Sequence, residues 1–557
     1  MSLQWCLPLE VPEDTAEVGR KVLAPDNIYR LIGDRFAELW PDQSMFAPMY
    51  CDTGRGAVPP LLLSLVTVFQ AQEKLPDRVA AAMVASRIDW KYALHLPLTY
   101  AGFHFTDLLA FRQRLEEHDQ ERLVFDEFLK RLQALGLVRR RPRVRTDSTH
   151  VLGRVHRLGQ LELITESLRV ALQATAKIAL EWCEQAVPST LRETYTQRQG
   201  EYGLSDTEVK TRLIEVGKDA FWFLAQVERS APADVRELPE VATLRTVLQQ
   251  QFPGGPGRPP AKRPAGGDII ETPHETEARR ASKRGHAWTG YKMQVTETHD
   301  ADLPHLIVDL EVTAATANDS PELSKIQDRM EGRGIVPKEQ QVDQSYVSAE
   351  NLVDSAKRGI ELLGIPPADT AGPKGFRQTD FEIDEEQHRA VCPAGQTNVV
   401  WSERQNYPRC PDGLPAVQIR FAAQTCQQCK FFGQCTDSMQ GRSLLLHPYR
   451  AVLQARRAEA KTKAFLERLR PRAGIEGTVS ELVRAHGMRE ARYRGKEKLR
   501  LQGFFAATAA NLKRTMRWLS TTEKAAATTC SIVTAHQQRS TPPLARSMSA
   551  VPYPSCC

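Results

Sequence analysis

The sequence contains no apolar run that approaches the roughly 20 residues a helix needs to span a bilayer. Its start, Met1 to Glu10, lacks the basic stretch followed by an apolar stretch that marks a secretory signal. Neither sign of charge dominates, because 74 Lys and Arg residues face 68 Asp and Glu residues. We therefore expect a cytoplasmic protein without membrane spans, whose net charge of +6 says little about a nucleic-acid partner.

The length and composition suit a protein with several hydrophobic cores. The chain has 557 residues, of which 41% are hydrophobic, and this length suggests about two to four domains. Up to about Arg141 the apolar residues recur at helical spacing, for example over residues 61–72 and 107–135. We therefore expect a helical N-terminal domain.

Strand signals begin after this region, with short apolar and β-branched runs between helical stretches. A helical segment and a Pro- and Gly-rich linker separate the first strand from the others. Helices between the later strands imply parallel neighbours in a mixed sheet. The predicted order is a strand at 144–151, helices over 158–251, strands at 291–298 and 305–313, a helix at 320–330, a strand ending at Asp343, a helix at 349–358 and a strand at 361–365.

Two aspartates stand at equivalent places in this pattern. Asp147 lies in the β-prone stretch Val144-Arg-Thr-Asp-Ser-Thr-His-Val151, and Asp343 ends a later strand. A carboxylate among residues that favour a buried sheet is costly unless it is paired or binds a cation. Because the predicted strands are neighbours, we expect the two carboxylates to share a metal site.

A third carboxylate is expected from the C-terminal helical region. Ile475 and Leu482 recur on one helix face, so Glu476 projects from a neighbouring edge. Glu481 on the same helix is the alternative third acid. Arg472 lies four residues before Glu476 and could reach either a carboxylate or a phosphate.

Four segments resemble the core of the DDE transposases of bacterial insertion sequences. In chain order they are Arg145-Thr-Asp-Ser-Thr149, Trp288-Thr-Gly-Tyr-Lys292, Val342-Asp-Gln-Ser-Tyr346 and Arg472-Ala-Gly-Ile-Glu476. The resemblance is strongest to the insertion sequence 1182 family, related to the insertion sequence 4 and 5 groups, and runs from about Ile28 to Arg517. It implies an α/β fold with an RNase H-like catalytic core, a mixed sheet flanked by helices, and Asp147, Asp343 and Glu476 as the catalytic acids.

The three acids suit metal-dependent phosphodiester chemistry. Carboxylate oxygens are preferred ligands of Mg²⁺, and two such ions (or Mn²⁺) can activate water and stabilise the leaving 3′-oxygen. The resemblance implies double-stranded DNA partners, both terminal inverted repeats and target DNA, and a homodimer in the active complex, with the N-terminal helices binding DNA ends or forming the dimer. Two alternatives stay open: an RNase H-like nuclease that does not transpose, and an inactive transposase relic that only binds DNA.

Basic residues cluster beside the expected catalytic strands. Such clusters neutralise phosphates and make binding salt-dependent, although solvated faces or linkers also carry them. One cluster precedes Asp147 and another precedes Trp288, where it comprises Arg258, Lys262, Arg263, Arg279, Arg280, Lys283 and Arg284. The residues we expect to bind DNA are Arg139, Arg140, Arg141, Arg143, Arg145, Lys292, Arg472 and Arg484.

Cysteines concentrate in a Pro- and Gly-punctuated stretch near residues 372–446. Cys426 and Cys429 have the spacing that lets two thiolates reach one tetrahedral zinc, and Cys435 is close enough to be a third ligand. Cys392 is the best fourth candidate and Cys410 the next. The stretch resembles a Cys-rich insertion of the same transposases. A structural Zn²⁺ and reduced thiols without metal are both open, whereas disulfides are disfavoured.

These expectations divide the chain into six parts. The tail is rich in Thr, Ala, Ser and Pro, so we expect it to be disordered. The parts are a helical N-terminal domain (1–141), the catalytic core (142–157 and 268–371), a helical insertion with its linker (158–267), a Cys-rich insertion (372–446), a C-terminal helical part of the core (447–519) and the tail (520–557).

Overall fold

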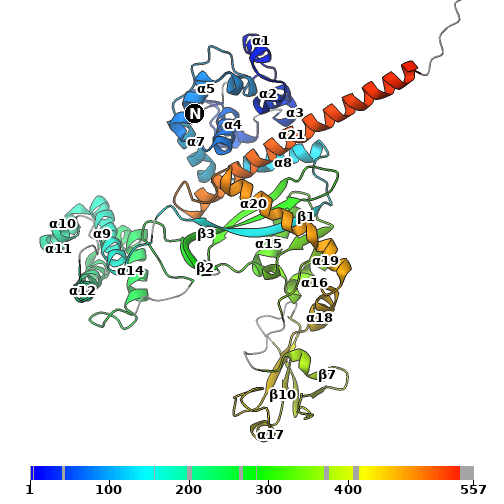
Figure 1. Cartoon of the computed structure of the whole chain (residues 1–557). Helices are drawn as coiled ribbons and strands as arrows, with labels where there is room; N and C mark the ends of the chain where they lie inside the picture. Colours follow the sequence, from blue (N-terminus) through cyan, green and yellow to red (C-terminus); the bar gives the residue numbers. More distant parts are fainter. Residues whose placement is uncertain are drawn as a thin grey trace, which may run out of the picture.

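The computed structural model describes most of the chain. The described residues are 2–3, 6–40, 44–155, 157–196, 204–261, 267–283, 285–368, 375–405 and 413–539, with side chains up to 522. A central sheet joins a group of N-terminal helices, a separate helical insertion and a small β-rich unit (Figure 1). None of the helices searched in the described residues is long and apolar enough to span a membrane.

The central sheet has six strands and mixes parallel with antiparallel pairs. Its path is β2-β3-β1-β5-β6, and β4 also pairs with β3. β1 is antiparallel to β3 and parallel to β5, which is in turn parallel to β6. The strands are β1 (Arg143–Leu152), β2 (Arg279–Lys283), β3 (His286–Thr298), β4 (Ile307–Ala314), β5 (Glu339–Val342) and β6 (Glu361–Leu363). The predicted mixed sheet and the adjacency of the strands that carry the two aspartates are confirmed.

Successive residues of a strand point to opposite faces of a sheet, so each face presents side chains that another layer can cover. Helices cover both faces of this sheet. On one face lie α15 (Ser320–Gly332) and α16 (Ala349–Lys357), which follow β4 and β5. Gln327 of α15 donates hydrogen bonds to Gln340 of β5 and to Ser355 of α16 there. The other face is covered by α20 (Ile475–Arg484) and α21 (Lys496–Arg539). The catalytic aspartates expected from the sequence therefore lie in a layered α/β/α core.

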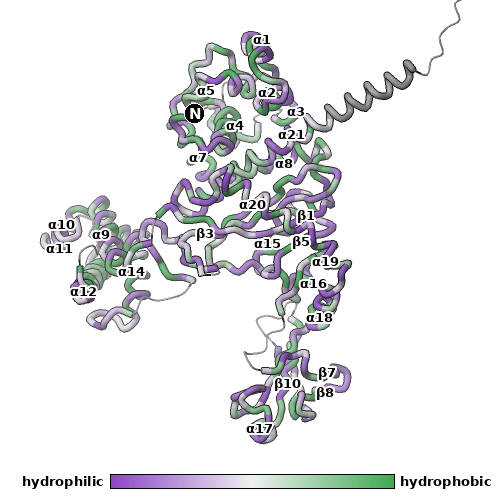
Figure 2. The backbone as a smooth tube through the Cα atoms, viewed as in Figure 1, coloured by the Kyte–Doolittle hydropathy of each residue, from purple (hydrophilic) through white to green (hydrophobic). Residues whose placement is uncertain are grey.

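The N-terminal region is helical, as predicted, and shares its hydrophobic core with the sheet. Residues of these helices, of β1 and β3–β5 and of α20 and α21 form one continuous buried cluster. α4 is apolar almost throughout (Figure 2), and α21 packs against it on one side and against β4 on another. The helices are α1 (Glu13–Val22), α2 (Ile28–Asp34), α3 (Phe36–Leu39), η1 (Ser44–Met49), α4 (Pro60–Glu73), α5 (Asp77–Ser86), α6 (Ile88–Ala93), α7 (Thr106–Glu117) and α8 (Leu123–Ala134).

The helical insertion between β1 and β2 has its own core. Its buried cluster contains residues such as Leu168, Phe223 and Leu244 and is separate from that of the sheet. Ser205 and Glu208 form a capping box at the start of its longest helix, which explains where that helix begins. The helices are α9 (Gln160–Ile178), α10 (Leu180–Ala186), α11 (Ser189–Thr194), α12 (Asp206–Ser230), α13 (Ala233–Arg236) and α14 (Pro239–Gln251).

The Cys-rich stretch forms a small unit that projects from the sheet between β6 and α18 (Figure 1). It contains a two-stranded and a three-stranded antiparallel sheet. Its elements are η3 (Gln378–Asp380), β7 (Glu382–Asp384), β8 (Arg389–Val391), β9 (Val400–Arg404), β10 (Ala416–Arg420), α17 (Ala423–Gln427) and β11 (Ser443–Leu446). The chain then returns to the core through α18 (Arg450–Glu459), α19 (Lys463–Leu469) and η5 (Arg470–Gly474).

The last described helix enters the C-terminal tail, for which the sequence predicts disorder. α21 continues to Arg539, and residues 540–557 lie outside the described residues. The run from Lys524 to Thr528 includes three consecutive alanines, which have the highest intrinsic helix propensity. A composition too poor in large apolar residues to bury a core can therefore still extend a helix that is already nucleated.

Candidate active site

Asp147 and Asp343 lie side by side where the parallel pairing of β1 with β5 ends, although β1 itself continues to Leu152. The pairing of β1 with β5 ends where Thr146 faces Val342, so each aspartate is the next residue along its strand. The carboxyl ends of neighbouring parallel strands meet at one edge of the sheet, a frequent place for ligand sites in α/β folds. Two carboxylates 196 positions apart in the sequence are thereby brought to one place.

The surroundings of Asp147 are unfavourable for an uncompensated negative charge. Its side chain is only 20% exposed. Burial raises the pKa of Asp147 above its ordinary value, and the nearby charge of Asp343 acts in the same direction. A hydrogen bond from the Ser148 backbone N–H and the positive charges of Arg472 and Lys283 oppose this shift without cancelling it. A bound cation would remove the repulsion between the two carboxylates, so these residues fit a divalent metal.

A buried polar network fixes the turn that carries Asp343. Directly after Asp343 the short helix η2 (Gln344–Tyr346) ends at Tyr346, which is fully buried. Its hydroxyl donates a hydrogen bond to Gln294 of β3, and Gln294 donates to Asp319 at 3.0 Å. Asp319 also accepts a hydrogen bond from Lys292 at 3.0 Å. These hydrogen bonds therefore hold the turn that carries Asp343 in place.

The same network includes Lys292, which the sequence predicts to bind DNA. Its ammonium group is taken up by Asp319 and by the Ala317 carbonyl oxygen, and its side chain is only 17% exposed. Although burial opposes ionisation, the hydrogen bonds and charge of its partners hold the pKa of Asp319 below its ordinary value. Lys292 thus neutralises a buried carboxylate and supports the site indirectly.

The segment before Glu476 crosses the sheet directly above Asp147. Arg472 in η5 extends its guanidinium group to the Asp147 carboxylate, with Nη1 3.4 Å from Oδ2. The segment is tied to the strands beneath by Gln341, which donates to the Arg468 carbonyl oxygen at 2.8 Å, and by Arg145, which donates to the Pro471 carbonyl oxygen at 2.7 Å. Arg472 is therefore held in contact with the aspartate site.

Gly474 allows this close approach. A Cβ atom at this position would lie 2.0 Å from Nη1 of Arg145, so the arginine would have to leave its hydrogen bonds with Glu297 and the Pro471 carbonyl oxygen. The glycine in the segment Arg472-Ala-Gly-Ile-Glu476 therefore lets the start of α20 settle onto the sheet.

The two rival third acids lie in different surroundings. Glu481 is bound to Arg514 of α21 by hydrogen bonds of 2.7 and 3.0 Å. A hydrogen bond with His486 and the charges of Arg514 and Lys513 lower the pKa of Glu481 to about 2, although burial opposes the shift. Glu476 is exposed in the first turn of α20, four residues after the arginine that contacts Asp147. Glu481 is thus occupied by a structural contact.

The described residues expected to bind metal do not surround a position where an ion could sit. Within the described residues, no three His, Cys, Asp or Glu side chains form a group that could hold a metal ion. This applies to Asp147, Asp343 and Glu476, and equally to the described cysteines. Of the three acids, the two aspartates are neighbours on the sheet, and Glu476 lies four residues after Arg472, which contacts Asp147.

Arg145, which the sequence predicts to bind DNA, is buried and has a carboxylate partner. Arg145 is 6% exposed, and its Nε donates to Glu297 of β3 at 2.7 Å. Glu297 is fully buried and also accepts hydrogen bonds from Thr478 of α20 and, at 2.9 Å, from Arg514 of α21. Because Arg145 and Asp147 share one face of β1, this ion network fastens α20 and α21 to the face that carries the catalytic candidates.

Loss of Glu297 should destabilise this arrangement strongly. Glu297→Ala leaves Arg145 buried without its carboxylate, and breaking a buried ion pair in this way typically costs about 3–5 kcal/mol. We expect the free energy of unfolding to fall by about that amount, measured by urea unfolding followed through tryptophan fluorescence. Glu17→Ala, which removes an exposed ion pair with Lys21, should leave the transition nearly unchanged. Equal effects of the two substitutions would contradict the assigned role of Glu297.

The remaining basic candidates are distributed around the site. Arg139 pairs with Asp300 and Asp302, and Arg141 donates to the Gly359 carbonyl oxygen at 2.6 Å. Three others, Arg140, Arg143 and Arg484, are exposed. These surface residues are accessible for phosphate contact, whereas Arg145 and Lys292 are engaged by carboxylates inside the fold.

Sequence reasoning did not single out a second basic area beyond the end of β1. Arg154, Arg157, Arg280 and Trp288 line a cavity of about 430 Å³ there. Nearby, His150 of β1 stacks near Trp288, with ring centroids 5.0 Å apart, and contacts Arg489 at 2.7 Å. Arg280 belonged to a basic cluster visible in the sequence, but Arg154, Arg157 and Arg489 lie in two other parts of the sequence, and the fold brings them near it.

Comparison with known protein families adds independent information. Residues 391–516 match the model of a Transposase DDE domain, and residues 17–114 match that of a Transposase domain (DUF772). The first match contains Arg472 and Glu476, and the second lies within the N-terminal helices. No match was found among curated proteins or among solved structures. The two matches support a bacterial insertion-sequence transposase with a DDE domain as the class of this protein.

Proposed function

We propose that this protein binds the ends of its insertion sequence and catalyses DNA cleavage and strand transfer through Asp147, Asp343 and Glu476. The observation that carries the proposal is the contact between Arg472, from the matched DDE domain, and Asp147, which neighbours Asp343 on the sheet. Three chain segments far apart in sequence thereby converge on one place. We further propose that the protein is of the insertion sequence 1182 type.

The topology supports an RNase H-like core for this chemistry. The strand order β4-β3-β1-β5-β6 has three antiparallel strands followed by two parallel ones. Asp147 comes from the middle strand of this order and Asp343 from the strand beside it. The third acid, Glu476, comes from the helix that covers the same face.

The three carboxylates would hold two Mg²⁺ or Mn²⁺ ions, which lower the pKa of bound water and stabilise the leaving oxygen. Carboxylate oxygens suit these hard cations, and burial together with the charge of Asp343 raises the pKa of Asp147, a shift that a bound cation would oppose. In the first reaction a water oxygen forms a bond to phosphorus, the bond from phosphorus to the 3′-oxygen breaks, and that oxygen takes up a proton. In the second, the freed 3′-hydroxyl attacks a phosphorus of the target strand and displaces the target's own 3′-oxygen.

The positive side chains around the acids would orient the DNA backbone. Arg472 contacts Asp147, and Lys283 is close enough to influence the pKa of the same carboxylate. Both could meet the phosphate that approaches the aspartates. The N-terminal helices, which carry the second transposase match, would bind DNA ends or join two copies of the chain, because a homodimer supplies one site for each end of the element.

The proposal is tested with duplex DNA that carries the sequences flanking the coding region. The protein, a target plasmid and Mg²⁺ are incubated with this DNA, and the ends and joined products are mapped by sequencing. We expect 3′-hydroxyl ends at one defined position and joined products, both abolished by EDTA. Cleavage without any joining would instead support the nuclease alternative. Specific binding without cleavage in Mg²⁺ or Mn²⁺ would support the inactive relic.

A further inference from the structure

The Cys-rich unit has little hydrophobic core to hold it together. Its buried hydrophobic cluster in the described residues is small and consists of Phe381, Ala390, Ile419, Phe421, Leu444 and Leu446. Units of this size gain only about 3–5 kcal/mol from such a core and commonly depend on a metal or disulfides. The described cysteines of the unit are all free thiols.

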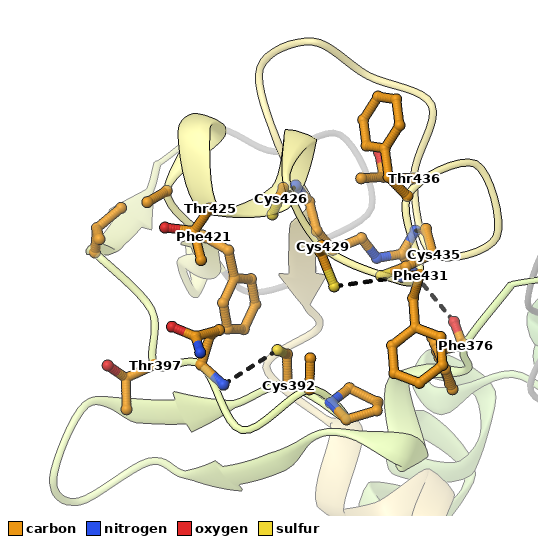
Figure 3. A pocket seen from close by; sticks show the side chains of 17 residues that line it. Phe376, Cys392, Thr397, Phe421, Thr425, Cys426, Cys429, Phe431, Cys435 and Thr436 are labelled. Atoms are coloured by element: carbon orange, nitrogen blue, oxygen red, sulfur yellow. Dashed lines mark hydrogen bonds between the residues drawn. The ribbon is translucent and has the colours of Figure 1, made fainter.

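Four of these thiols surround one cavity. Cys392 follows β8, Cys426 lies on α17, and Cys429 and Cys435 follow in the next turns. All four line the same space of about 200 Å³ (Figure 3). The fifth cysteine of the unit, Cys410, lies outside the described residues. The fold therefore gathers the three closely spaced cysteines with Cys392, which the sequence alone separates from them by more than 30 residues.

Backbone amides point at three of the four sulfur atoms. The N–H groups of Gln396, Phe431 and Arg442 donate to Cys392, Cys429 and Cys426, respectively, over donor-to-sulfur distances of 3.4 to 3.5 Å. A neutral thiol is a weak acceptor, whereas a thiolate carries the charge that such donors stabilise. This pattern of donors suits metal-bound thiolates better than free thiols.

The charges around the cavity also favour a bound cation. Four thiolates would repel one another unless a cation sat among them. Arg442 borders the cavity and donates to the Cys435 and Phe376 carbonyl oxygens at 3.2 Å, so a positive charge is already fixed beside the cluster.

We propose that Cys392, Cys426, Cys429 and Cys435 bind one structural Zn²⁺. Four soft thiolates in a tetrahedral arrangement are the ligand set that zinc prefers, whereas Mg²⁺ requires oxygen ligands. The sulfur atoms line the wall of the cavity at spacings too wide to hold an ion as they stand. Binding would draw them inward and close the loops between β8 and β11. This site is independent of the DNA chemistry proposed above.

Metal analysis of the purified full-length protein tests the site. Protein prepared without chelators should contain about one zinc per chain by elemental analysis. Co²⁺ substitution should give the intense absorption bands of tetrahedral thiolate coordination. Cys429→Ser and Cys392→Ser should each lose the zinc and make residues 375–446 sensitive to protease. Full zinc retention in either variant would overturn the assigned ligand set.

Two matched substitutions complete the experiment. Cys183→Ser changes a buried thiol of the helical insertion, and Cys410→Ser changes the remaining cysteine of the Cys-rich unit. Both should keep zinc and protease resistance. If wild-type protein contains no zinc and the unit still resists protease, ordinary packing orders it and the proposal fails. If Cys410→Ser loses zinc while Cys392→Ser keeps it, the fourth ligand is wrong.

Discussion

Asp147→Asn should abolish Mg²⁺-dependent cleavage of the element's ends while leaving DNA binding largely intact. The substitution removes a metal ligand and almost no volume, and the contact partners of Asp147 are few. We expect a loss of at least about 1,000-fold in cleavage rate, since essential members of a catalytic group have effects of this size or larger. End binding is measured by electrophoretic mobility shift. Cleavage at the wild-type rate would refute the assignment of Asp147.

The melting temperature of the same variant provides a control, because it should stay the same or rise while the cleavage rate falls. The folded-state pKa of Asp147 is raised, so the folded protein holds this proton more tightly than the unfolded chain does. Its ionisation therefore destabilises the metal-free fold as pH rises through that pKa. At neutral pH without divalent ions, Asp147→Asn should melt at the wild-type temperature or above it. Adding Mg²⁺ should raise the melting temperature of the wild type more than that of the variant.

Glu476→Gln and Glu481→Gln should have opposite consequences. If Glu476 is the third metal ligand, its substitution eliminates cleavage and changes the melting temperature little, because its side chain is exposed. Glu481→Gln should retain most of the cleavage activity, because that carboxylate is occupied by Arg514. Cleavage is compared at a temperature well below both melting transitions.

Glu481→Gln should nevertheless reduce stability. The folded-state pKa of Glu481 is lowered to about 2, so its ionised form stabilises the fold above its ordinary pKa, and this contribution is lost as pH falls toward 2. At pH 7 the glutamine variant lacks it and should melt at a lower temperature, whereas the difference from the wild type should shrink in acid. The reverse pattern, with cleavage lost only in Glu481→Gln, would move the third acid to Glu481.

Local patterns in the sequence predicted much of the fold. The β-branched run around Asp147, the helical spacing of the N-terminal region and the Pro- and Gly-rich linker each determine a segment through short-range preferences, and the corresponding elements are present. Parallel pairing of β5 with β6 also followed, because the crossover helix α16 between them favours parallel neighbours.

The role of each charged residue could not be read in the same way. Arg145 and Lys292 belong to basic or motif segments, yet Glu297 and Asp319 neutralise them inside the fold. Their partners lie on other strands or after them, so only the strand register determines which arginine is buried and which meets solvent. The same holds for Glu481, whose partner Arg514 is 33 residues away on α21.

The contact between Arg472 and Asp147 joins residues 325 positions apart, which has a consequence during protein synthesis. At the usual 5–20 residues per second, a ribosome needs roughly 16–65 s to add that stretch. α21, which covers β4 and α4, emerges later still. A prematurely terminated chain would expose those apolar surfaces and be prone to aggregation and proteolysis, so incomplete products should not persist as unregulated nucleases.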